Sequence, residues 1–214
     1  MASFQTERER MVEFQIARRG VRNDRVLEAM RSVPRHLFLP DEARSYAYAD
    51  CPVRIGNGQT MSQPYIVALM TELLAVESHH KALDVGTGSG YQAAILAELC
   101  QEVHTIERYH GLAERAQKNL EELGYRNVYV HVGDGTQGYP PFAPYDRIIV
   151  GAAAPSVPEA LLEQLSDEGR MVIPVGSRFS QSLEVWIKKG KDIHHTSSIP
   201  VVFVPLVGKD GWNE

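Results

Sequence analysis

The stretch Leu83-Asp84-Val85-Gly86-Thr87-Gly88-Ser89-Gly90-Tyr91 decides the fold, because a short apolar run is followed by three glycines and then by a helical pattern. Glycines at such a turn let the backbone approach a ligand without a Cβ in the way. The helix behind them presents free N–H groups and the positive end of its dipole. In open α/β sheets, ligands bind at this carboxyl end of the strands. The stretch therefore predicts a strand, a ligand-binding loop and a helix.

The acidic residue of this loop separates two classes of cofactor. Dinucleotide sites use Gly-x-Gly-x-x-Gly, whereas here Tyr91 stands at the place of the third dinucleotide glycine. Asp84 would repel a pyrophosphate, but it suits a cationic ligand with an amino group, such as the methionine part of S-adenosylmethionine (SAM). We therefore predict a SAM site and disfavour a nicotinamide cofactor. A tight glycine turn without a ligand is the alternative.

Two further acids follow the next strands of the pattern. Glu107 ends the second strand, where a carboxylate can accept hydrogen bonds from both ribose hydroxyls of NAD or of SAM. Gly133-Asp134-Gly135 ends the third strand, and its aspartate is either a turn residue or the acceptor for an adenine amino group. Three acids at three successive strand ends strengthen the prediction of a SAM site.

The chain around these acids alternates strands with helices. Such β-α alternation predicts an α/β fold with a Rossmann-like, doubly wound, mostly parallel sheet, as in SAM-dependent methyltransferases. Beyond it, Leu183–Lys188 and Ile199–Leu206 are strand-like on either side of a turn, so we expect at least one antiparallel strand at that edge. Strands are expected at 82–85, 102–106, 128–132, 146–150 and 170–175, and helices at 91–99, 112–123 and 158–165.

The first fifty residues have a helical pattern of apolar residues among many charges. Gly20 is a plausible C-cap, and Asn23 can cap a second helix, Asp24–Ser32. The stretch Cys51–Thr60 is rich in Gly and Pro and indicates a loop. We therefore expect an N-terminal helical segment and a substrate-side loop, followed by a helix that starts near Ser62-Gln63-Pro64.

Length and composition limit the class of protein. The 214 residues, with 43% hydrophobic and 23% charged residues, fit a single domain 1–214, divided into a segment 1–60 and an α/β core 61–214. The net charge of −5 and the lack of a basic stripe disfavour nucleic acid, and no apolar run is long enough for a membrane span. Cys51 and Cys100 have neither disulfide nor metal spacing. We expect a cytoplasmic monomer without a metal ion.

The end of the fourth strand indicates what the acceptor is. The stretch Ile148–Pro155 has small apolar residues where amino-methylating enzymes carry Asn/Asp-Pro-Pro-aromatic and metal-dependent ones carry carboxylates, and it has no Pro-Cys nucleophile. A phenol or amine usually needs a base or metal, whereas a carboxylate with a pKa of about 4 is already ionised at neutral pH. A base-free pocket therefore favours a carboxylate acceptor, which needs only positioning.

The segment Gly56-Asn57-Gly58-Gln59-Thr60-Met61-Ser62-Gln63-Pro64, together with the glycine loop, Gly133-Asp134-Gly135 and Tyr145–Val150, closely resembles protein-L-isoaspartate O-methyltransferases. The resemblance runs from about Arg22 to Leu206. It implies transfer of a methyl group from SAM to the free α-carboxylate of L-isoaspartyl residues in damaged proteins and peptides. The ester then cyclises to a succinimide, which initiates repair.

The resemblance also implies roles for single residues. Ser62 matches the active-site serine that contacts the acceptor carboxylate, although it could instead be only a helix N-cap. The rival functions are a SAM-dependent methyltransferase for a small molecule or a nucleic acid, and a binding module without catalysis. The implied cofactor contacts are Asp84, Gly86, Thr87 and Gly88 on the methionine side, Glu107 at the ribose, and Asp134 and Gly135 at the adenine.

Overall fold

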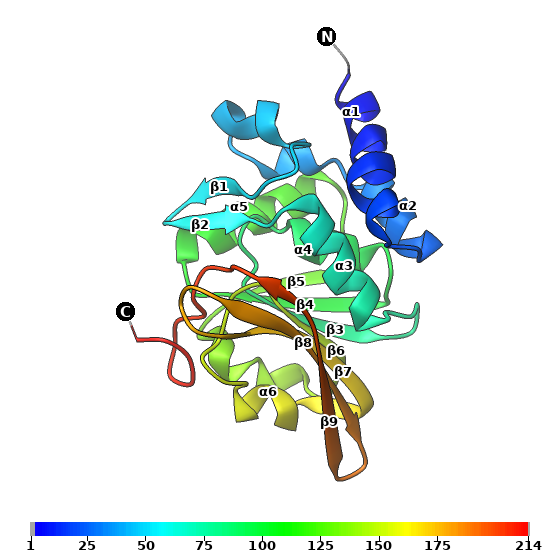
Figure 1. Ribbon diagram of the computed structural model, residues 1–214. Coiled ribbons are helices and arrows are strands. Elements are labelled where there is room, and N and C mark those ends of the chain that lie inside the picture. Colours follow the sequence, from blue (N-terminus) through cyan, green and yellow to red (C-terminus); the bar gives the residue numbers. More distant parts are fainter. Residues whose placement is uncertain (1–2, 214) are drawn as a thin grey trace.

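The apolar runs that follow Lys81 form a sheet in the order β5-β4-β3-β6-β7-β8-β9 (Figure 1). The computed structural model describes residues 3–213. The first five of these strands in space pair in parallel, which confirms the predicted sheet. The strand order reverses between β3 and β6, and ligands bind at such a switch point. The parallel strands are β3 (Lys81–Val85), β4 (Glu102–Glu107), β5 (Val128–Val132), β6 (Tyr145–Val150) and β7 (Leu165–Gly176).

The remaining two strands confirm an antiparallel edge and correct its position. β8 (Gln181–Lys189) pairs with β9 (Asp192–Val201) through a turn at Gly190. The strand expected at 199–206 is wrong, because β9 starts directly after the turn and ends at Val201. Its residues 192–198 are exposed at the sheet edge and therefore have no apolar pattern that sequence reasoning could detect.

Helices cover both faces of the sheet. Val67, Ile95 and Leu112 belong to one apolar cluster together with the N-terminal helices, whereas Leu161 belongs to the cluster on the opposite face. The helix expected at 158–165 is shorter in the structure, where it spans Glu159–Glu163, because β7 already pairs with β6 at Leu165. The helices are α3 (Pro64–Leu74), α4 (Tyr91–Ala97), α5 (His110–Glu122) and α6 (Glu159–Glu163), with short 3-10 turns η5 (Gly135–Gln137) and η6 (Pro140–Phe142).

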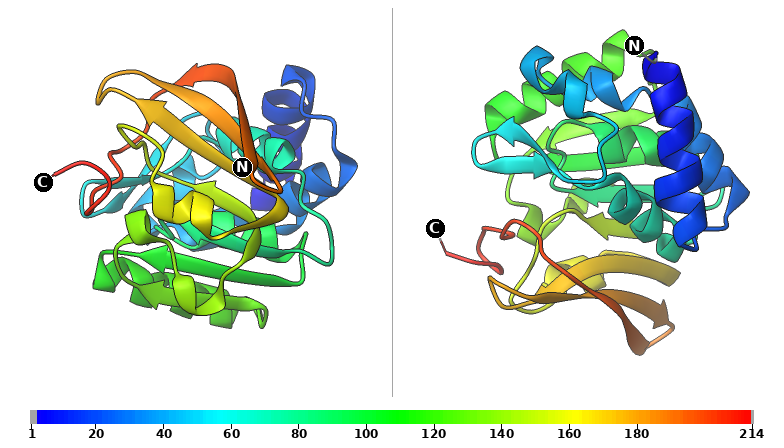
Figure 2. Two further views of the ribbon diagram at one scale, coloured as in Figure 1. Left: turned by 90° about the horizontal axis from the view of Figure 1, so that it is seen from below. Right: turned by 45° about the horizontal axis from the view of Figure 1, so that its top comes forward.

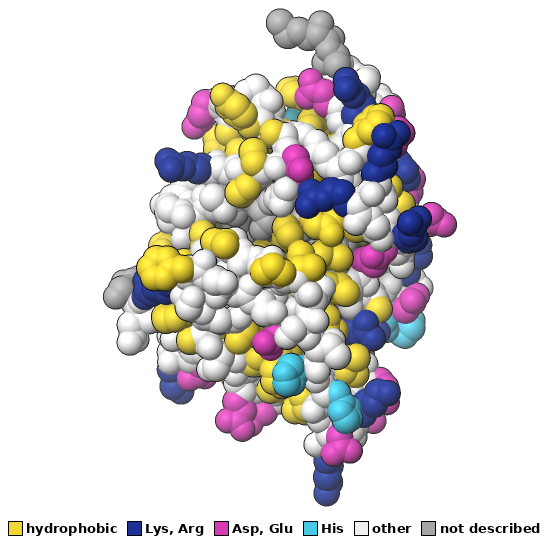
Figure 3. Space-filling view, viewed as in Figure 1, with side chains coloured by type: hydrophobic (Ala, Val, Ile, Leu, Met, Phe, Trp, Pro, Cys, Tyr) yellow, Lys and Arg dark blue, Asp and Glu magenta, His cyan; other side chains and the backbone are white. Residues whose placement is uncertain are grey.

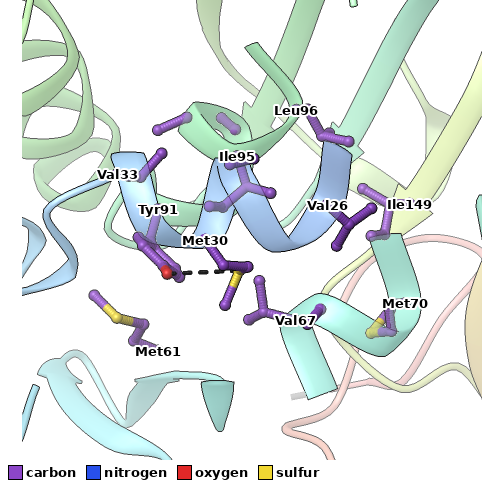
Figure 4. Packing of buried hydrophobic residues seen from close by; sticks show 14 of the residues in the cluster. Val26, Met30, Val33, Met61, Val67, Met70, Tyr91, Ile95, Leu96 and Ile149 are labelled. Carbon is purple, nitrogen blue, oxygen red and sulfur yellow. Dashed lines mark hydrogen bonds between the residues drawn. The ribbon is translucent and has the colours of Figure 1, made fainter. Parts of the chain in front are cut away.

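The N-terminal segment is helical, as predicted. Gly20 has φ of 104° at its C-cap position, and the Asn23 side chain accepts hydrogen bonds from the N–H groups of Arg25 and Val26. Its helices pack into the same apolar cluster as α3 and α4, where Val26 and Met30 lie beside Ile95 and Leu96 (Figure 4). The elements are α1 (Phe4–Arg10), η1 (Met11–Ile16), η2 (Ala17–Arg19), α2 (Asp24–Ser32), η3 (Arg35–Phe38) and η4 (Asp41–Tyr46).

The segment expected to be a loop at 51–60 is instead mostly a β-hairpin, so that expectation is wrong. β1 (Val53–Gly56) and β2 (Gln59–Met61) pair antiparallel and form a small sheet apart from the main one (Figure 2). Asn57 and Gly58 have φ of 50° and 70°. Positive φ at both central residues is typical of the tight two-residue turn that joins the strands of a hairpin. The Gly- and Pro-rich composition hid the buried-exposed alternation of β1. Within residues 3–213, no helix combines the length and apolar character of a membrane span.

Candidate active site

Three cavities meet at the carboxyl ends of β3, β4 and β6. The largest, the outer cleft, has a volume of about 590 Å³ and is bounded by Ser62, Tyr65 and the segment 199–204. The loop pocket lies behind it, between the glycine loop and α3, and the strand-end pocket lies beside the ends of β4 and β6. Thr60 and Gly151 line all three, so a ligand in either inner pocket can meet one in the outer cleft there.

Asp84, at the end of β3, lines the loop pocket with a fully buried carboxylate. Its Oδ2 accepts a hydrogen bond of 2.8 Å from the Thr105 hydroxyl. The Thr105 oxygen lies 2.6 Å from that of Thr87, so Thr87 donates to Thr105, whose only proton is already used. Asp84 Oδ1 is buried and has no hydrogen-bond partner within residues 3–213. A pocket with an orphan carboxylate oxygen fits a ligand that brings an amino group.

Burial controls the ionisation of Asp84. Desolvation, with the nearby charge of Glu107, raises its pKa to about 7, although the hydrogen bond from Thr105 acts in the opposite direction. Close to neutral pH, the carboxyl is therefore poised between its two protonation states. A cationic ligand group in the loop pocket would favour the ionised state.

Glu107, at the end of β4, joins the glycine loop to the strand-end pocket. Its Oε2 accepts the Gly88 N–H at 2.9 Å, and its Oε1 accepts the Tyr109 N–H at 2.9 Å. Each carboxylate oxygen can accept more than one hydrogen bond, so capacity remains for two hydroxyl donors. Because Glu107 lines the strand-end pocket, it fits a ribose there.

The loop between these acids depends on glycine. Gly86 and Gly88 have φ of 93° and 54°, and residues with a Cβ rarely adopt such backbone angles. A Cβ on Gly88 would also lie 3.2 Å from Ile55 Cδ1. Both glycines line the loop pocket and the strand-end pocket, so their bare backbone forms the wall between them.

Asp134 and Gly135 are placed differently from each other. Gly135 lines the strand-end pocket, whereas Asp134 lies outside its lining. Burial alone would raise the pKa of Asp134, but hydrogen bonds from Lys209 N–H and from Thr136 hold it below its ordinary value. Asp134 Oδ2 accepts from Lys209 N–H at 2.8 Å and Oδ1 from the Thr136 hydroxyl at 2.7 Å. Its carboxylate thus binds the C-terminal segment, and a contact of Asp134 with adenine stays a prediction.

Ser62 lies between β2 and α3 and lines both the outer cleft and the loop pocket. The residue at the N-cap position of α3 is Gln63, so the alternative of Ser62 as an N-cap is wrong. Its carbonyl accepts a hydrogen bond of 2.8 Å from Arg35 Nη2. Within the described residues its hydroxyl has no partner, which leaves this group available for a ligand at the meeting point of two cavities.

The lining of the outer cleft is mostly uncharged. Among the described residues that line it, Arg19 is the only charged one, and none is a histidine or a carboxylate. Hydrophobic side chains gather around the hollow on this face (Figure 3). Among residues 3–213, no three His, Cys, Asp or Glu side chains are grouped as metal ligands. Such a cleft suits an acceptor that is already ionised and needs alignment.

Sequence reasoning missed several residues of these cavities. Thr60 and Gly151, which line all three, were seen only as parts of longer segments. Phe203 and its neighbours come from the far end of the chain, and no local pattern indicates that they reach the cleft. Alternation along β2 could have found Thr60, because Thr60 and Ser62 are two residues apart and flank the buried Met61.

Together, the doubly wound sheet, the glycine loop and the acids at the ends of β3 and β4 define a SAM-dependent methyltransferase. The family model for protein-L-isoaspartate(D-aspartate) O-methyltransferase matches residues 6–211. The chain belongs to this family.

Relatives and solved structures agree with the family. The chain is 53% identical to protein-L-isoaspartate O-methyltransferase 1 of Syntrophobacter fumaroxidans, over 99% of both chains. It is 55% identical to the protein-L-isoaspartate O-methyltransferase of Methanoregula boonei, over 96% of this chain and 95% of that one. A solved protein-L-isoaspartate O-methyltransferase superposes with a TM-score of 0.85 at 30% identity, covering 95% of this chain and 67% of the other. The putative Plasmodium falciparum enzyme, solved in complex with S-adenosyl-L-homocysteine, has a TM-score of 0.82 at 27% identity, over 94% and 98%.

Proposed function

We propose that the chain transfers a methyl group from SAM to the free α-carboxylate of L-isoaspartyl residues in damaged proteins and peptides, and so initiates their repair. The observation that carries the proposal is the position of Ser62. Its unpartnered hydroxyl lies where the outer cleft meets the loop pocket, among cleft walls that offer no base. Family membership and the S-adenosyl-L-homocysteine in a solved relative support the same reaction.

The residues of the inner pockets fit SAM. We assign the orphan Oδ1 of Asp84 to the amino group of the methionine part and Glu107 to the ribose hydroxyls. Gly86, Thr87 and Gly88 shape the loop between them, while Gly135 and Asp134 belong to the adenine side. When bound, SAM supplies an activated methyl group to the cleft.

On the acceptor side, the chain provides orientation. The Ser62 hydroxyl donates a hydrogen bond to one oxygen of the acceptor carboxylate and aims the other oxygen at the cofactor side. Since the carboxylate is ionised at neutral pH, no group has to remove a proton from it. The apolar wall at 199–204 excludes water from the reacting carboxylate.

The remaining proposals concern partners and location. The acceptors are isoaspartyl proteins and peptides, and we propose a monomer that binds neither nucleic acid nor membranes. Two cysteines, Cys51 and Cys100, are unpaired thiols, which supports a reducing compartment such as the cytoplasm. The domain division proposed is a helical and hairpin segment 1–60 on an α/β core 61–214.

The test is transfer of labelled methyl from SAM to an isoaspartyl peptide and to its aspartyl twin. The isoaspartyl α-carboxylate is one methylene nearer the main chain, so a cleft that holds the backbone aligns only one of the two. A misplacement of about 1 Å can cost about 10²-fold in rate, and we expect at least that preference. Equal rates on both peptides would refute the isoaspartyl assignment. Rates that rise only with a small molecule or nucleic acid would establish the rival acceptor.

A further inference from the structure

Arg35 is a buried arginine without an acidic partner. It is the largest side chain that is fully buried, and no carboxylate pairs with it within residues 3–213. Desolvation by burial lowers its pKa, since an ionised guanidinium is costly to remove from water. One of its nitrogens, Nη1, has no partner within the described residues. A side chain this costly to bury calls for an explanation in what it contacts.

The contacts of Arg35 lead directly to Ser62. Its Nε donates to the Ala47 carbonyl at 2.7 Å and its Nη2 to the Ser62 carbonyl at 2.8 Å. The first hydrogen bonds of α3 use the carbonyl of Gln63, so the Ser62 carbonyl takes no part in them. Arg35 is therefore the group that fixes the peptide plane immediately after the Ser62 side chain.

The other neighbours of Ser62 are also held from the N-terminal segment. Gln63 Nε2 donates to Asp50 Oδ1 at 2.7 Å, and Asp50 pairs with Arg19 at 3.1 Å. On the other side, Met61 is a buried residue of the core. The backbone of Ser62 is thus clamped on both sides, while its hydroxyl stays unpartnered in the cavity.

The same guanidinium contacts the cofactor side. It lies 4.8 Å from the ring centroid of Tyr91, the residue that opens α4 directly behind the glycine loop. Tyr91 is itself held, because its hydroxyl donates to Met30 Sδ at 3.7 Å (Figure 4). Arg35 therefore joins the backbone of Ser62 to the first turn behind the loop that we assign to SAM.

We propose that Arg35 is a positioning residue, which sets the Ser62 hydroxyl relative to the glycine loop so that the acceptor carboxylate is aligned with the transferred methyl. This inference rests on the proposed role of Ser62. It explains why an arginine is buried there: an apolar side chain of similar length would fill the space, but it would not hold the carbonyl of Ser62.

The test compares Arg35→Met with a matched control, Arg25→Met. Arg25 also lies in the N-terminal segment and donates to two backbone carbonyls of the core, those of Val76 and Leu99. Neither Val76 nor Leu99 lines one of the three cavities, whereas Ser62 lines two of them. We expect kcat/KM on the isoaspartyl peptide to fall about tenfold or more in Arg35→Met, while the Kd for SAM changes less than about threefold. Arg25→Met should lower Tm and leave kcat/KM unchanged. Equal kcat/KM in the two variants would overturn the inference.

A double variant separates this inference from the proposed function. If Arg35 acts through Ser62, adding Arg35→Met to Ser62→Ala causes no further loss of kcat/KM, whereas two independent losses would multiply. Multiplying losses therefore overturn the inference but leave the role of Ser62 intact. A fully active Ser62→Ala would instead remove the role of Ser62 itself. If Arg35→Met does not fold, Arg35→Lys replaces it, since lysine keeps the charge but not the planar fork of donors.

Discussion

The inner pockets and the outer cleft, which meet at Thr60 and Gly151, are built in opposite ways. The inner pockets use buried carboxylates at adjacent strand ends, each fixed by hydrogen bonds to hydroxyl or backbone groups. The outer cleft uses apolar walls from both ends of the chain and a single charged lining residue among those described, Arg19. The proposed function accounts for the difference, because a cationic cofactor favours ionised partners, whereas an acceptor that is already ionised needs alignment.

The largest effect that would sharpen this contrast is expected at Gly88. We expect Gly88→Val to lower the affinity for SAM by more than about 100-fold. Valine does not tolerate φ of 54°, and its side chain would meet Ile55. Calorimetric titration measures the affinity and circular dichroism the fold. Gly190→Val is the control, with φ of 58° and open space around its Cβ, and it should bind SAM normally. Normal binding by Gly88→Val would remove the loop from the cofactor site.

The next effect concerns Glu107. We expect Glu107→Ala to weaken SAM binding by about 1–3 kcal/mol, since hydrogen bonds to a charged group are lost and the Gly88 N–H loses its acceptor. Glu102→Ala, at the other end of the same strand, serves as control and should not change the affinity measured by titration. An unchanged affinity of Glu107→Ala would contradict its place at the ribose.

On the acceptor side, Ser62→Ala should act on rate and not on cofactor affinity. We expect kcat/KM for the isoaspartyl peptide to fall about tenfold, because an orienting donor is lost, while the Kd for SAM stays nearly constant. Steady-state kinetics and titration on the same preparation test both statements. A parallel loss of SAM affinity would break the division between the two regions.

The smallest effect is a pH dependence that originates on the cofactor side. The pKa of Asp84 is raised to about 7, so the native protein keeps this proton up to that pH, whereas the unfolded chain loses it near the ordinary value. The unliganded enzyme therefore loses stability as pH rises from about 4 to about 7. In the proposed assignment SAM binds the ionised carboxylate of Asp84, so its affinity should fall about fourfold between pH 8 and pH 6.5.

Asp84→Asn tests both predicted pH dependences, that of the stability and that of the affinity for SAM. Without the titrating group, the stability measured as Tm should exceed that of the unliganded wild type at pH 8, and the difference should be smaller at pH 5. SAM binding should be weak at both pH values, without the fourfold slope. A wild-type affinity that is constant over this range would show that Asp84 does not titrate with the ligand.

Local signals indicated most of the named residues that line the inner pockets, although Asp134 lies outside their lining. The Asn23 cap, the apolar strands and the acids that end them all depend on neighbouring residues, so the sequence reveals them. The outer cleft depends on the hairpin and on the segment 199–204, which are brought together only by tertiary packing. β9 escaped prediction because an exposed edge strand requires no apolar face. Arg35 escaped for a related reason, since one arginine in a charged helical segment is normally on the surface.

The hairpin Val53–Met61 has a consequence for which changes of length this sequence can accept. Its register pairs Val53 with Met61 and Arg54 with Thr60, which keeps Met61 in the core and lets Thr60 line all three cavities. Inserting or deleting one residue in the turn would exchange the two faces, turning Thr60 inward and Met61 out. A change in the number of residues between Val53 and Ser62 is therefore expected to disrupt the cavities, whatever residue is inserted or removed.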